Sequence, residues 1–204
     1  MNIEYFRAAI MVNLNERLLL DKIRTPEVLN YGHVLVRVHF SSICGSQIGE
    51  INGIKGPDPH LPHLLGHEGS GIVIEVGPGV QYVQVGDKVV MHWRSGRGIQ
   101  AQPPIYHWRN KFVNAGYVTT FNEYAVVSEN RLTPLPPHYP LEYAALYGCA
   151  VTTGLGVIEN NAQLKMGQSI VVLGAGGVGL NIIQGARLHS GYPIVAVDRF
   201  ASRL

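Results

Sequence analysis

Residues 169–179 read SIVVLGAGGVG, a short apolar strand that runs directly into a glycine-rich turn. Gly174, Gly176 and Gly179 give the pattern G-x-G-x-x-G in the setting that the motif requires, after a strand and at the start of a helix. Gly174 permits the sharp turn, Gly176 lets the backbone approach a pyrophosphate, and Gly179 lets the helix pack closely on the strand. The helix that begins at Gly177 offers amide N–H groups to phosphates. The stretch therefore predicts a dinucleotide-binding loop.

An acidic residue follows the second strand of the same unit. A helix from Gly177 to about His189 and an apolar strand at 194–197 complete a β-α-β unit. Asp198 lies 24 positions after Gly174, where a carboxylate can accept hydrogen bonds from an adenosine ribose, and this favours NAD(H). Arg199 could pair with a 2′-phosphate, which keeps NADP(H) as an alternative. That alternative is less favoured, because the neighbouring carboxylate would repel the phosphate. The plainer interpretation is a glycine turn of another α/β protein with an ordinary strand-end acid.

The stretch that precedes this unit is predicted to be helical. The stretch from Leu141 to about Asn161 predicts helical segments that break or bend around Thr152-Thr153-Gly154. A doubly wound sheet normally has five or six strands, and residues 141–204 offer two. We therefore expect the start of such a domain, from a longer protein, with little or no turnover by these 204 residues alone.

Residues 1–140 predict a different domain, rich in short strands. The predicted strands are 34–40, 69–76, 88–91 and 121–127. In the first of these the two-residue alternation places four side chains toward a core: Val34, Val36, Val38 and Phe40. The 24 glycines are typical of many tight turns between short strands. Together these features indicate a small closed β-domain.

Two stretches of this domain do not follow the strand pattern. Residues 93–115 lack a clear period and predict a long excursion without regular structure. Residues 133–137 are rich in proline, so they cannot join a central strand or a helix interior. After them the character of the sequence changes toward the helical part.

Composition excludes several classes of partner. The formal charge is +2 and the Lys and Arg residues are scattered, so neither nucleic acid nor an anionic membrane is an expected partner. Residues 1–4 lack the pattern of a signal peptide, and no apolar stretch approaches the roughly 20 residues that span a bilayer. With only two cysteines, a cytoplasmic location is expected.

Those two cysteines and one histidine are candidate metal ligands. Cys44, His67 in the sequence Gly-His-Glu, and Cys149 offer two thiols and an imidazole, which Zn²⁺ prefers when one position stays open for catalysis. Their spacing alone does not show that they converge. The cysteines could instead be small buried apolar residues or form a disulfide. The neighbouring His60 and His63 are interpreted as ordinary solvated or core histidines.

These motifs, in this order, resemble the zinc-type medium-chain alcohol dehydrogenases over essentially the whole chain. The matching stretches are Cys44-Gly45-Ser46, Gly66-His67-Glu68, Gly86-Asp87-Lys88-Val89, Gly148-Cys149 to Gly156, and the loop 174–179. The resemblance implies a GroES-like β-barrel catalytic domain over 1–140, then the first β-α-β unit of a Rossmann domain over 141–204. It also implies one catalytic zinc on Cys44, His67 and Cys149.

Further roles are implied by the resemblance alone. Ser46 resembles the hydroxyl that contacts the substrate oxygen and begins a proton relay, and Glu68 resembles the acid beside the zinc. Thr153 and Val178 resemble residues against the nicotinamide, and Trp93 resembles an aromatic of the substrate pocket. The reaction implied is interconversion of an alcohol and its aldehyde or ketone with NAD(H).

The sequence departs from the family pattern in three places. Gln47 stands where the family often has an aspartate bonded to the zinc-bound histidine, and Gly49 stands where many members have a relay histidine. No cysteine occurs between Trp93 and Tyr117, so we expect no four-cysteine structural zinc.

Two other functions stay open. One is an NADPH-linked carbonyl reductase, and the other is a noncatalytic scaffold that binds zinc and nucleotide, which Gln47 and Gly49 would favour. A zinc-free quinone reductase of the same fold is opposed by the intact Cys-His-Cys set. The expected partners are a small alcohol or carbonyl compound and, for the whole protein, copies of itself in a homodimer or homotetramer.

Overall fold

The computed structural model describes residues 3–204, so Met1 and Asn2 of the segment compared with signal peptides lie outside the described residues. Contacts divide the chain into two compact units, Met1–Gly148 and Cys149–Leu204. Residues 141–148, which the sequence assigned to the second domain, pack with the first unit. The domain assignment itself stays a prediction, and each unit is described by itself.

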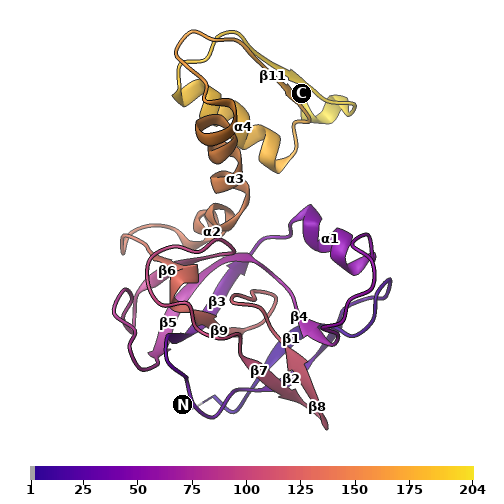
Figure 1. The fold of residues 1–204 in the computed structure, drawn as a ribbon, viewed down its shortest axis with the longest axis vertical. Coiled ribbons are helices and arrows are strands. Elements are labelled where there is room, and N and C mark those ends of the chain that lie inside the picture. Colours follow the sequence, from indigo (N-terminus) through magenta and orange to yellow (C-terminus); the bar gives the residue numbers. More distant parts are fainter. Residues whose placement is uncertain (1–2) are drawn as a thin grey trace. The chain divides into compact units, whose positions relative to one another are not determined.

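A closed β-barrel forms one part of the first unit (Figure 1). Its strands, in the order of their pairing, are β1 (Tyr5–Met11), β2 (Leu19–Arg24), β7 (Ile105–Trp108), β8 (Lys111–Asn114) and β4 (His63–Leu64). Neighbouring strands are antiparallel except for β4 and β8, which are parallel. The predicted closed β-domain, and with it the GroES-like fold class, is confirmed.

A five-stranded antiparallel sheet forms the other part of this unit. Its strands, in spatial order, are β10 (Leu132–Pro134), β6 (Lys88–His92), β5 (Glu68–Val76), β3 (His33–Ser41) and β9 (Tyr124–Ser128). The four predicted strands correspond to β3, β5, β6 and β9. Pro134 lies in β10 at the edge of the sheet, where a residue without an N–H is tolerated.

Strand β3 is buried on both faces at its start and exposed at its end. Leu35 packs into the barrel core, whereas Val34 and Val36 pack into a second apolar cluster on the other side of the strand. Phe40 is 44% exposed, so the prediction that it faces the core is wrong. The strict two-residue alternation does not extend to the end of the strand. β-bulges shift the register of β3 against β5 between Leu35 and Val36 and again before Phe40.

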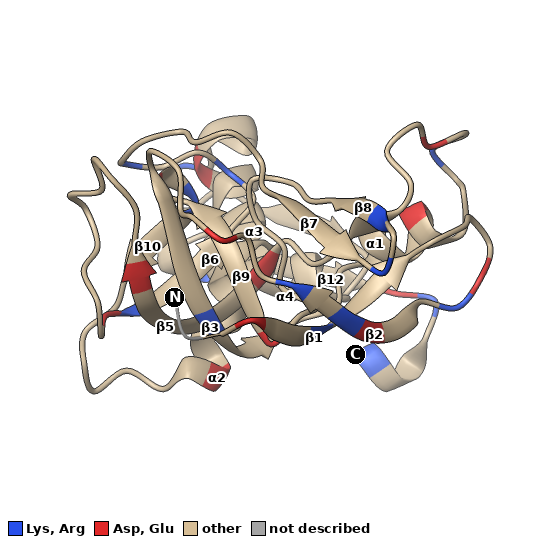
Figure 2. Cartoon of the chain, turned by 90° about the horizontal axis from the view of Figure 1, so that it is seen from below, with Lys and Arg blue, Asp and Glu red and all other residues tan. Residues whose placement is uncertain are grey.

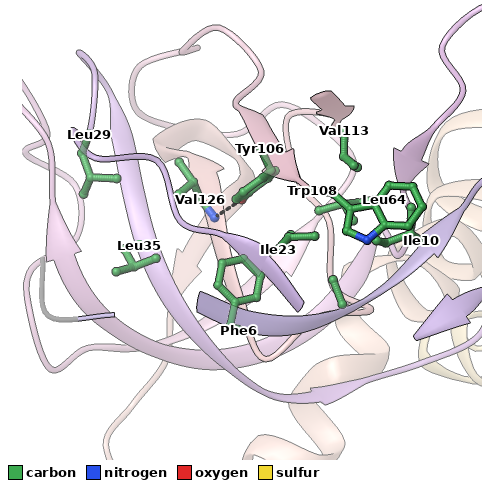
Figure 3. Packing of buried hydrophobic residues seen from close by; sticks show 11 residues of the cluster. Phe6, Ile10, Ile23, Leu29, Leu35, Leu64, Tyr106, Trp108, Val113 and Val126 are labelled. Atoms are coloured by element: carbon green, nitrogen blue, oxygen red, sulfur yellow. Dashed lines mark hydrogen bonds between the residues drawn. The ribbon is translucent and has the colours of Figure 1, made fainter. Parts of the chain in front are cut away.

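The barrel core is built around aromatic rings (Figure 3). Phe6 meets Tyr106 edge to face, with ring centroids 5.7 Å apart. Tyr106 is completely buried, and its hydroxyl oxygen accepts a hydrogen bond of 2.9 Å from the backbone N–H of Val126. This bond satisfies a buried polar group at the centre of an apolar cluster.

The prediction that residues 93–115 lack regular structure is wrong in its second half. Strands β7 and β8 form an antiparallel hairpin there, and Tyr106 and Trp108 alternate inward from β7. Arg109 turns the chain with φ of 54°, and its guanidinium and the Trp108 indole both donate to Asp21 on β2. The inward alternation was present in the sequence, but it spans only four residues.

Short helices complete the first unit. They are α1 (Gly45–Ile51), the 3₁₀ turn η1 (Glu129–Arg131), α2 (Leu141–Ala144) and the 3₁₀ segment η2 (Ala145–Gly148). Helix α1 follows β3 closely in sequence, and its first turn carries the residues next to Cys44.

The second unit has the predicted β-α-β order (Figure 1). Its elements are α3 (Ala150–Gly156), the π-helical segment η3 (Val157–Ala162), β11 (Ile170–Leu173), α4 (Gly177–Leu188), β12 (Ile194–Val197) and the 3₁₀ turn η4 (Ala201–Arg203). Strands β11 and β12 pair in parallel. The crossover through α4 is the connection that parallel strands require.

The predicted break at residues 152–154 is misplaced, because these residues lie inside α3 and the helical path is interrupted at Cys149. Gly154 has a packing role instead. A Cβ at this position would lie 2.4 Å from the Cβ of Asn181 on α4, so the glycine permits α3 and α4 to approach closely.

Charge is mixed over the surface of the first unit. Figure 2 shows acidic and basic residues interspersed, with both signs on β2, which carries Asp21, Lys22 and Arg24. Between residues 3 and 204, no single helix has the length and apolarity to cross a membrane. Leu141–Gly148 and Ala150–Ala162 meet that criterion of length and composition only when combined.

Candidate metal centre

Cys44 is held at the start of α1. Its backbone is extended, with φ of −92° and ψ of 144°, as is usual for the residue that precedes a helix. The Ser46 hydroxyl donates a hydrogen bond to the Cys44 sulfur over 3.3 Å. The sequence Cys-Gly-Ser therefore brings a thiol and a hydroxyl together through one helical turn.

His67 lies in the turn between β4 and β5, and Gly66 makes that turn possible. Gly66 has φ of +94°, and a Cβ on it would lie 2.3 Å from the Thr120 hydroxyl oxygen, so only glycine can occupy the position without strain. The Nε2 atom of His67 is buried and has no hydrogen-bond partner. Burial holds the pKa of His67 below its ordinary value, against the opposing influence of Glu68 and Glu50.

Glu68 begins β5 and is almost fully buried, at 3% exposure. Its backbone carbonyl accepts hydrogen bonds from the hydroxyls of Ser41 and Thr120, at 3.2 and 3.1 Å. The backbone of Gly148 packs against it, because a Cβ on Gly148 would lie 2.6 Å from the Cβ of Glu68 and 2.4 Å from the carbonyl oxygen of Met91. The last residue of the first unit is therefore fixed beside the Gly-His-Glu segment.

Within the first unit the structure brings together Cys44, His67 and Glu68. The sulfur, a ring nitrogen and a carboxylate oxygen of these residues lie within 4.8 Å of one another. A buried imidazole nitrogen without a partner is costly unless a ligand satisfies it. A sulfur and a nitrogen donor at this spacing suit Zn²⁺, and a neutral imidazole, which the lowered pKa favours, is the form that binds metal.

Cys149 and Thr153 belong to the second unit. The Thr153 hydroxyl lies 3.9 Å from the Cys149 sulfur, and the Thr153 N–H donates to the Cys149 carbonyl over 2.8 Å. It is the Thr152 side chain that hydrogen-bonds this carbonyl, at 3.1 Å, so Thr153 keeps its hydroxyl on the sulfur side. Cys44 and Cys149 are not joined in a disulfide.

Two residues of α1, Gln47 and Gly49, differ from the family pattern described above. Gln47 is 4% exposed, and its Oε1 atom is buried without a hydrogen-bond partner. Gly49 offers no side chain that could carry a proton, and a Cβ there would lie 3.6 Å from a methyl group of Ile54. The side chain of Gln47 is thus a buried neutral amide, which can donate and accept hydrogen bonds but carries no charge.

A cavity of about 570 Å³ opens beside His67 in the first unit. Its wall includes Gln47 and His67, together with a group of ionisable residues: Glu50, Asp58, His60 and His63. Trp93 is not among the lining residues. It follows β6 and is 49% exposed, and its carbonyl accepts a hydrogen bond of 2.9 Å from Arg131.

The glycine loop of the second unit has the geometry of an open cradle. Gly174 has φ of +101°, and a Cβ on Gly179 would lie 1.8 Å from the Gly174 carbonyl oxygen. By contrast, a Cβ on Gly176 or Gly177 would meet nothing within 4 Å. The loop is thus tightly closed on the strand side and open where α4 begins, with Val178 37% exposed in its first turn.

Asp198 connects the loop to the end of β12. One carboxylate oxygen accepts the N–H of Ala175 at 2.8 Å and the other accepts the N–H of Phe200 at 2.9 Å. The N–H groups of Phe200 and Ala175 hold the pKa of Asp198 below its ordinary value. A carboxylate has about four acceptor positions, so capacity for a ribose hydroxyl remains.

Arg203 is a residue that the sequence interpretation missed. With Arg199, Asp198 and Gly174 it lines a hollow of about 450 Å³, and its guanidinium lies 3.5 Å from the Asp198 carboxylate. The guanidinium groups of Arg199 and Arg203 each lie 4.9 Å from the centroid of the Phe200 ring. The short turn η4 brings Arg203 back to this position, and the local sequence has no pattern that predicts this turn.

The sequence matches one family, the alcohol dehydrogenase GroES-like domain, over residues 30–137. S-(hydroxymethyl)glutathione dehydrogenase of Synechocystis sp. is 34% identical, and the alignment covers 94% of this chain and 58% of that protein. The same enzyme of Escherichia coli is 32% identical over 82% of this chain and 52% of its own length. The chain thus spans just over half the length of the curated relatives it matches.

Solved structures agree with this assignment. Benzyl alcohol dehydrogenase from Acinetobacter calcoaceticus superposes with a TM-score of 0.85 at 27% identity, covering 99% of this chain and 60% of that one. An alcohol dehydrogenase zinc-binding domain protein from Burkholderia ambifaria gives a TM-score of 0.87 at 26% identity, covering 98% and 60%. The chain belongs to the zinc-type medium-chain alcohol dehydrogenase family.

Proposed function

We propose that this protein is a zinc-dependent oxidoreductase that interconverts an alcohol and its aldehyde or ketone with NAD(H). The observation that carries the proposal is the buried, unpartnered Nε2 of His67 beside the Cys44 sulfur. Membership of the family also supports the proposal, because the relatives named above include S-(hydroxymethyl)glutathione dehydrogenase and benzyl alcohol dehydrogenase.

Cys44, His67 and Cys149 would hold one zinc ion, and no four-cysteine zinc is proposed. Cys149 follows Gly148 directly, and the backbone of Gly148 packs on Glu68 and Met91. Adjacent Cα atoms are about 3.8 Å apart, so chain connectivity keeps Cys149 near the Gly-His-Glu segment. This supports Cys149 as the third ligand, with the fourth position open for substrate.

When bound, zinc supplies a Lewis acid that lowers the pKa of a substrate alcohol, and NAD⁺ supplies a hydride acceptor. The Ser46 hydroxyl, which is hydrogen-bonded to the Cys44 sulfur, would take the alcohol proton and pass its own proton to water. Glu68 contributes a buried negative charge next to His67. Trp93 would form part of the substrate pocket.

The second unit would supply the nucleotide site of a Rossmann domain. Amide N–H groups around Gly176 and Gly177 would bind the pyrophosphate, and Asp198 would accept from the ribose. Thr153 and Val178 would contact the nicotinamide. For residues 1–204 alone we propose little turnover, because β11 and β12 provide only two strands beside the cofactor.

A carbonyl reductase that uses NADPH is the second candidate, and one observation favours it. Arg199 and Arg203 both line the hollow next to Asp198, and two guanidinium groups could bind a 2′-phosphate. Asp198→Ala separates the candidates: it should weaken NAD(H) binding if the carboxylate binds ribose, and strengthen NADP(H) binding if the arginines dominate.

The direct test measures alcohol-dependent NADH formation by the zinc-loaded full-length enzyme, with benzyl alcohol and S-(hydroxymethyl)glutathione among the substrates. His67→Ala should abolish turnover, whereas His60→Ala, another histidine near the same cavity, should keep it. Equal loss in both variants, or turnover without zinc, would contradict the mechanism. A noncatalytic scaffold would bind zinc and nucleotide and give no NADH with any alcohol.

The proposed setting is the cytoplasm, with the full-length protein a homodimer or homotetramer.

A further inference from the structure

A second group of potential metal ligands lies in the first unit, separate from the thiol site. It consists of Glu50 in α1, Asp58 in the loop after α1, and His63 at the start of β4. One ligand atom from each lies within 4.8 Å of the other two. The Nε2 of His63 is 2.9 Å from Asp58 Oδ2 and 3.8 Å from Glu50 Oε1.

The orientation of the His63 ring is fixed by the backbone. Its Nδ1 lies 2.9 Å from the carbonyl oxygen of Leu64, which can only accept, so Nδ1 carries a proton and donates it. This is the arrangement that metal-ligating histidines commonly have on the ring nitrogen away from the metal. It leaves Nε2 directed toward the carboxylates of Asp58 and Glu50.

Each carboxylate also has its outer oxygen engaged. Asp58 Oδ1 accepts the N–H of His60 at 2.8 Å, and Glu50 Oε2 accepts from the Lys55 ammonium at 3.0 Å. Burial would raise the pKa of Asp58, but hydrogen bonds from His60 and His63 outweigh it and hold this pKa below its ordinary value. The inner oxygens, Asp58 Oδ2 and Glu50 Oε1, converge on His63 Nε2.

The supporting structure holds the three residues in place. Their side chains are only 10% to 25% exposed. The backbone of His63 pairs with β1 and with Asn114 of β8, and the Asn114 amide donates to the carbonyl of His60 at 2.7 Å. The loop that carries Asp58 is therefore tied to the barrel.

The cavity beside His67 gives an entry path. Glu50, Asp58 and His63 all line this space of about 570 Å³. Gln47 lines it too, and although it is 4% exposed its Oε1 is buried without a hydrogen-bond partner. The three candidate ligands therefore line a space large enough for a hydrated cation.

We propose that Glu50, Asp58 and His63 form a second divalent-cation site, with Nε2, Oδ2 and Oε1 as ligands and water in the remaining positions. Two carboxylates and one imidazole are a harder set than thiolates and suit Mn²⁺ as well as Zn²⁺. This site would add a cation to the single zinc of the thiol site. It does not rest on the proposed reaction.

The test titrates the 204-residue protein with Mn²⁺ and follows the electron paramagnetic resonance signal of free Mn²⁺. We expect about one bound Mn²⁺ per chain, lost in Asp58→Asn, because two charged ligands and an imidazole are the minimum donor set here. Glu27→Gln is the matched control, because Glu27 is an acid of the same unit whose side chain is 75% exposed. Cys44→Ser should also keep the bound Mn²⁺.

A gain-of-binding variant guards against loss by misfolding. Lys55 competes for Glu50, so Lys55→Met should tighten Mn²⁺ binding by up to about fivefold, the range of an exposed ion pair. Absence of Mn²⁺ binding in the unaltered protein would overturn the proposal and leave the group as hydrogen-bonded side chains that hold the loop on the barrel. Equal binding by Asp58→Asn, or loss in Cys44→Ser, would overturn it as well.

Discussion

In the first unit the candidate ligands come from separate elements, Cys44 before α1 and His67 between β4 and β5, whereas the glycine loop of the second unit is six contiguous residues. The candidate ligands of the first unit depend on two apolar clusters and a closed barrel for their position. The glycine loop of the second unit depends on one strand, one turn and one helix. A site of dispersed residues should therefore respond to changes far from it, and a contiguous loop mainly to changes within itself.

The largest expected effect tests the contiguous loop. Gly179→Ala places a methyl group 1.8 Å from the Gly174 carbonyl, so it should lower the free energy of unfolding by roughly 3 kcal/mol and abolish nucleotide binding. Gly176→Ala is the matched control, because its Cβ meets nothing within 4 Å and its φ is −81°. It should unfold like the unaltered protein yet bind nucleotide more weakly. Urea denaturation and calorimetric titration with NADH measure the two effects, and equal destabilisation would contradict the close packing.

The next effect tests whether a turn fixes the dispersed site. Gly66→Ala and Gly86→Ala share a positive φ, +94° and +93°, but only the first would meet close neighbours. Gly86→Ala should cost about 1–2 kcal/mol from backbone strain alone. Gly66→Ala should cost about 1 kcal/mol more from the clash with Thr120 and Phe121, and it should also weaken zinc binding. Matching denaturation midpoints for the two variants would show that crowding at Gly66 is unimportant.

A smaller effect examines the barrel core that supports the dispersed site. Tyr106→Phe removes the acceptor for the Val126 N–H and leaves a buried donor unsatisfied, which should cost about 1–3 kcal/mol. Zinc content should stay unchanged, because neither residue belongs to the site. Denaturation by urea gives the energy, and an unchanged midpoint would mean that Val126 finds another acceptor.

The smallest effect concerns pH. Hydrogen bonds from the Trp108 indole, the Lys22 N–H and Arg109 hold the pKa of Asp21 below its ordinary value. A depressed carboxyl pKa adds stability above the unfolded value of about 3.9, and this stability is lost as the pH falls through the lower folded value. Asp21→Asn should therefore destabilise the protein at neutral pH and have less effect below about pH 4. A pH-independent difference would argue that only packing at β2 has changed.

The same contrast explains how far the sequence predicted this protein. The loop 174–179, helix α4 and strands β11 and β12 were predictable, because strand, turn and helix signals follow one another locally. The β7–β8 hairpin was missed because four residues per strand give too short a period, and Phe40 was misplaced because bulges shift β3. Cys44 and His67 were recognised by motif, but only the barrel shows that they meet.

The Glu50, Asp58 and His63 group could not be predicted in the same way. His63 was interpreted as an ordinary histidine because nothing next to it in sequence suggests a ligand. Its partners lie 5 and 13 positions earlier, and a loop and a β-strand pairing bring them together. Arg203 returns to Asp198 through a turn of three residues at the end of the described chain.

Cys44, His67 and Cys149 are proposed to bind one metal ion through two thiolates. The most direct measurement is the thiolate-to-metal charge-transfer absorption of the Co²⁺-substituted protein, because carboxylate sites do not contribute to it. Cys149→Ser and Cys44→Ser should each remove about half of this absorption, because each removes one of two thiolates per metal, and the double variant should remove it all. Full absorption in Cys149→Ser would contradict the claim.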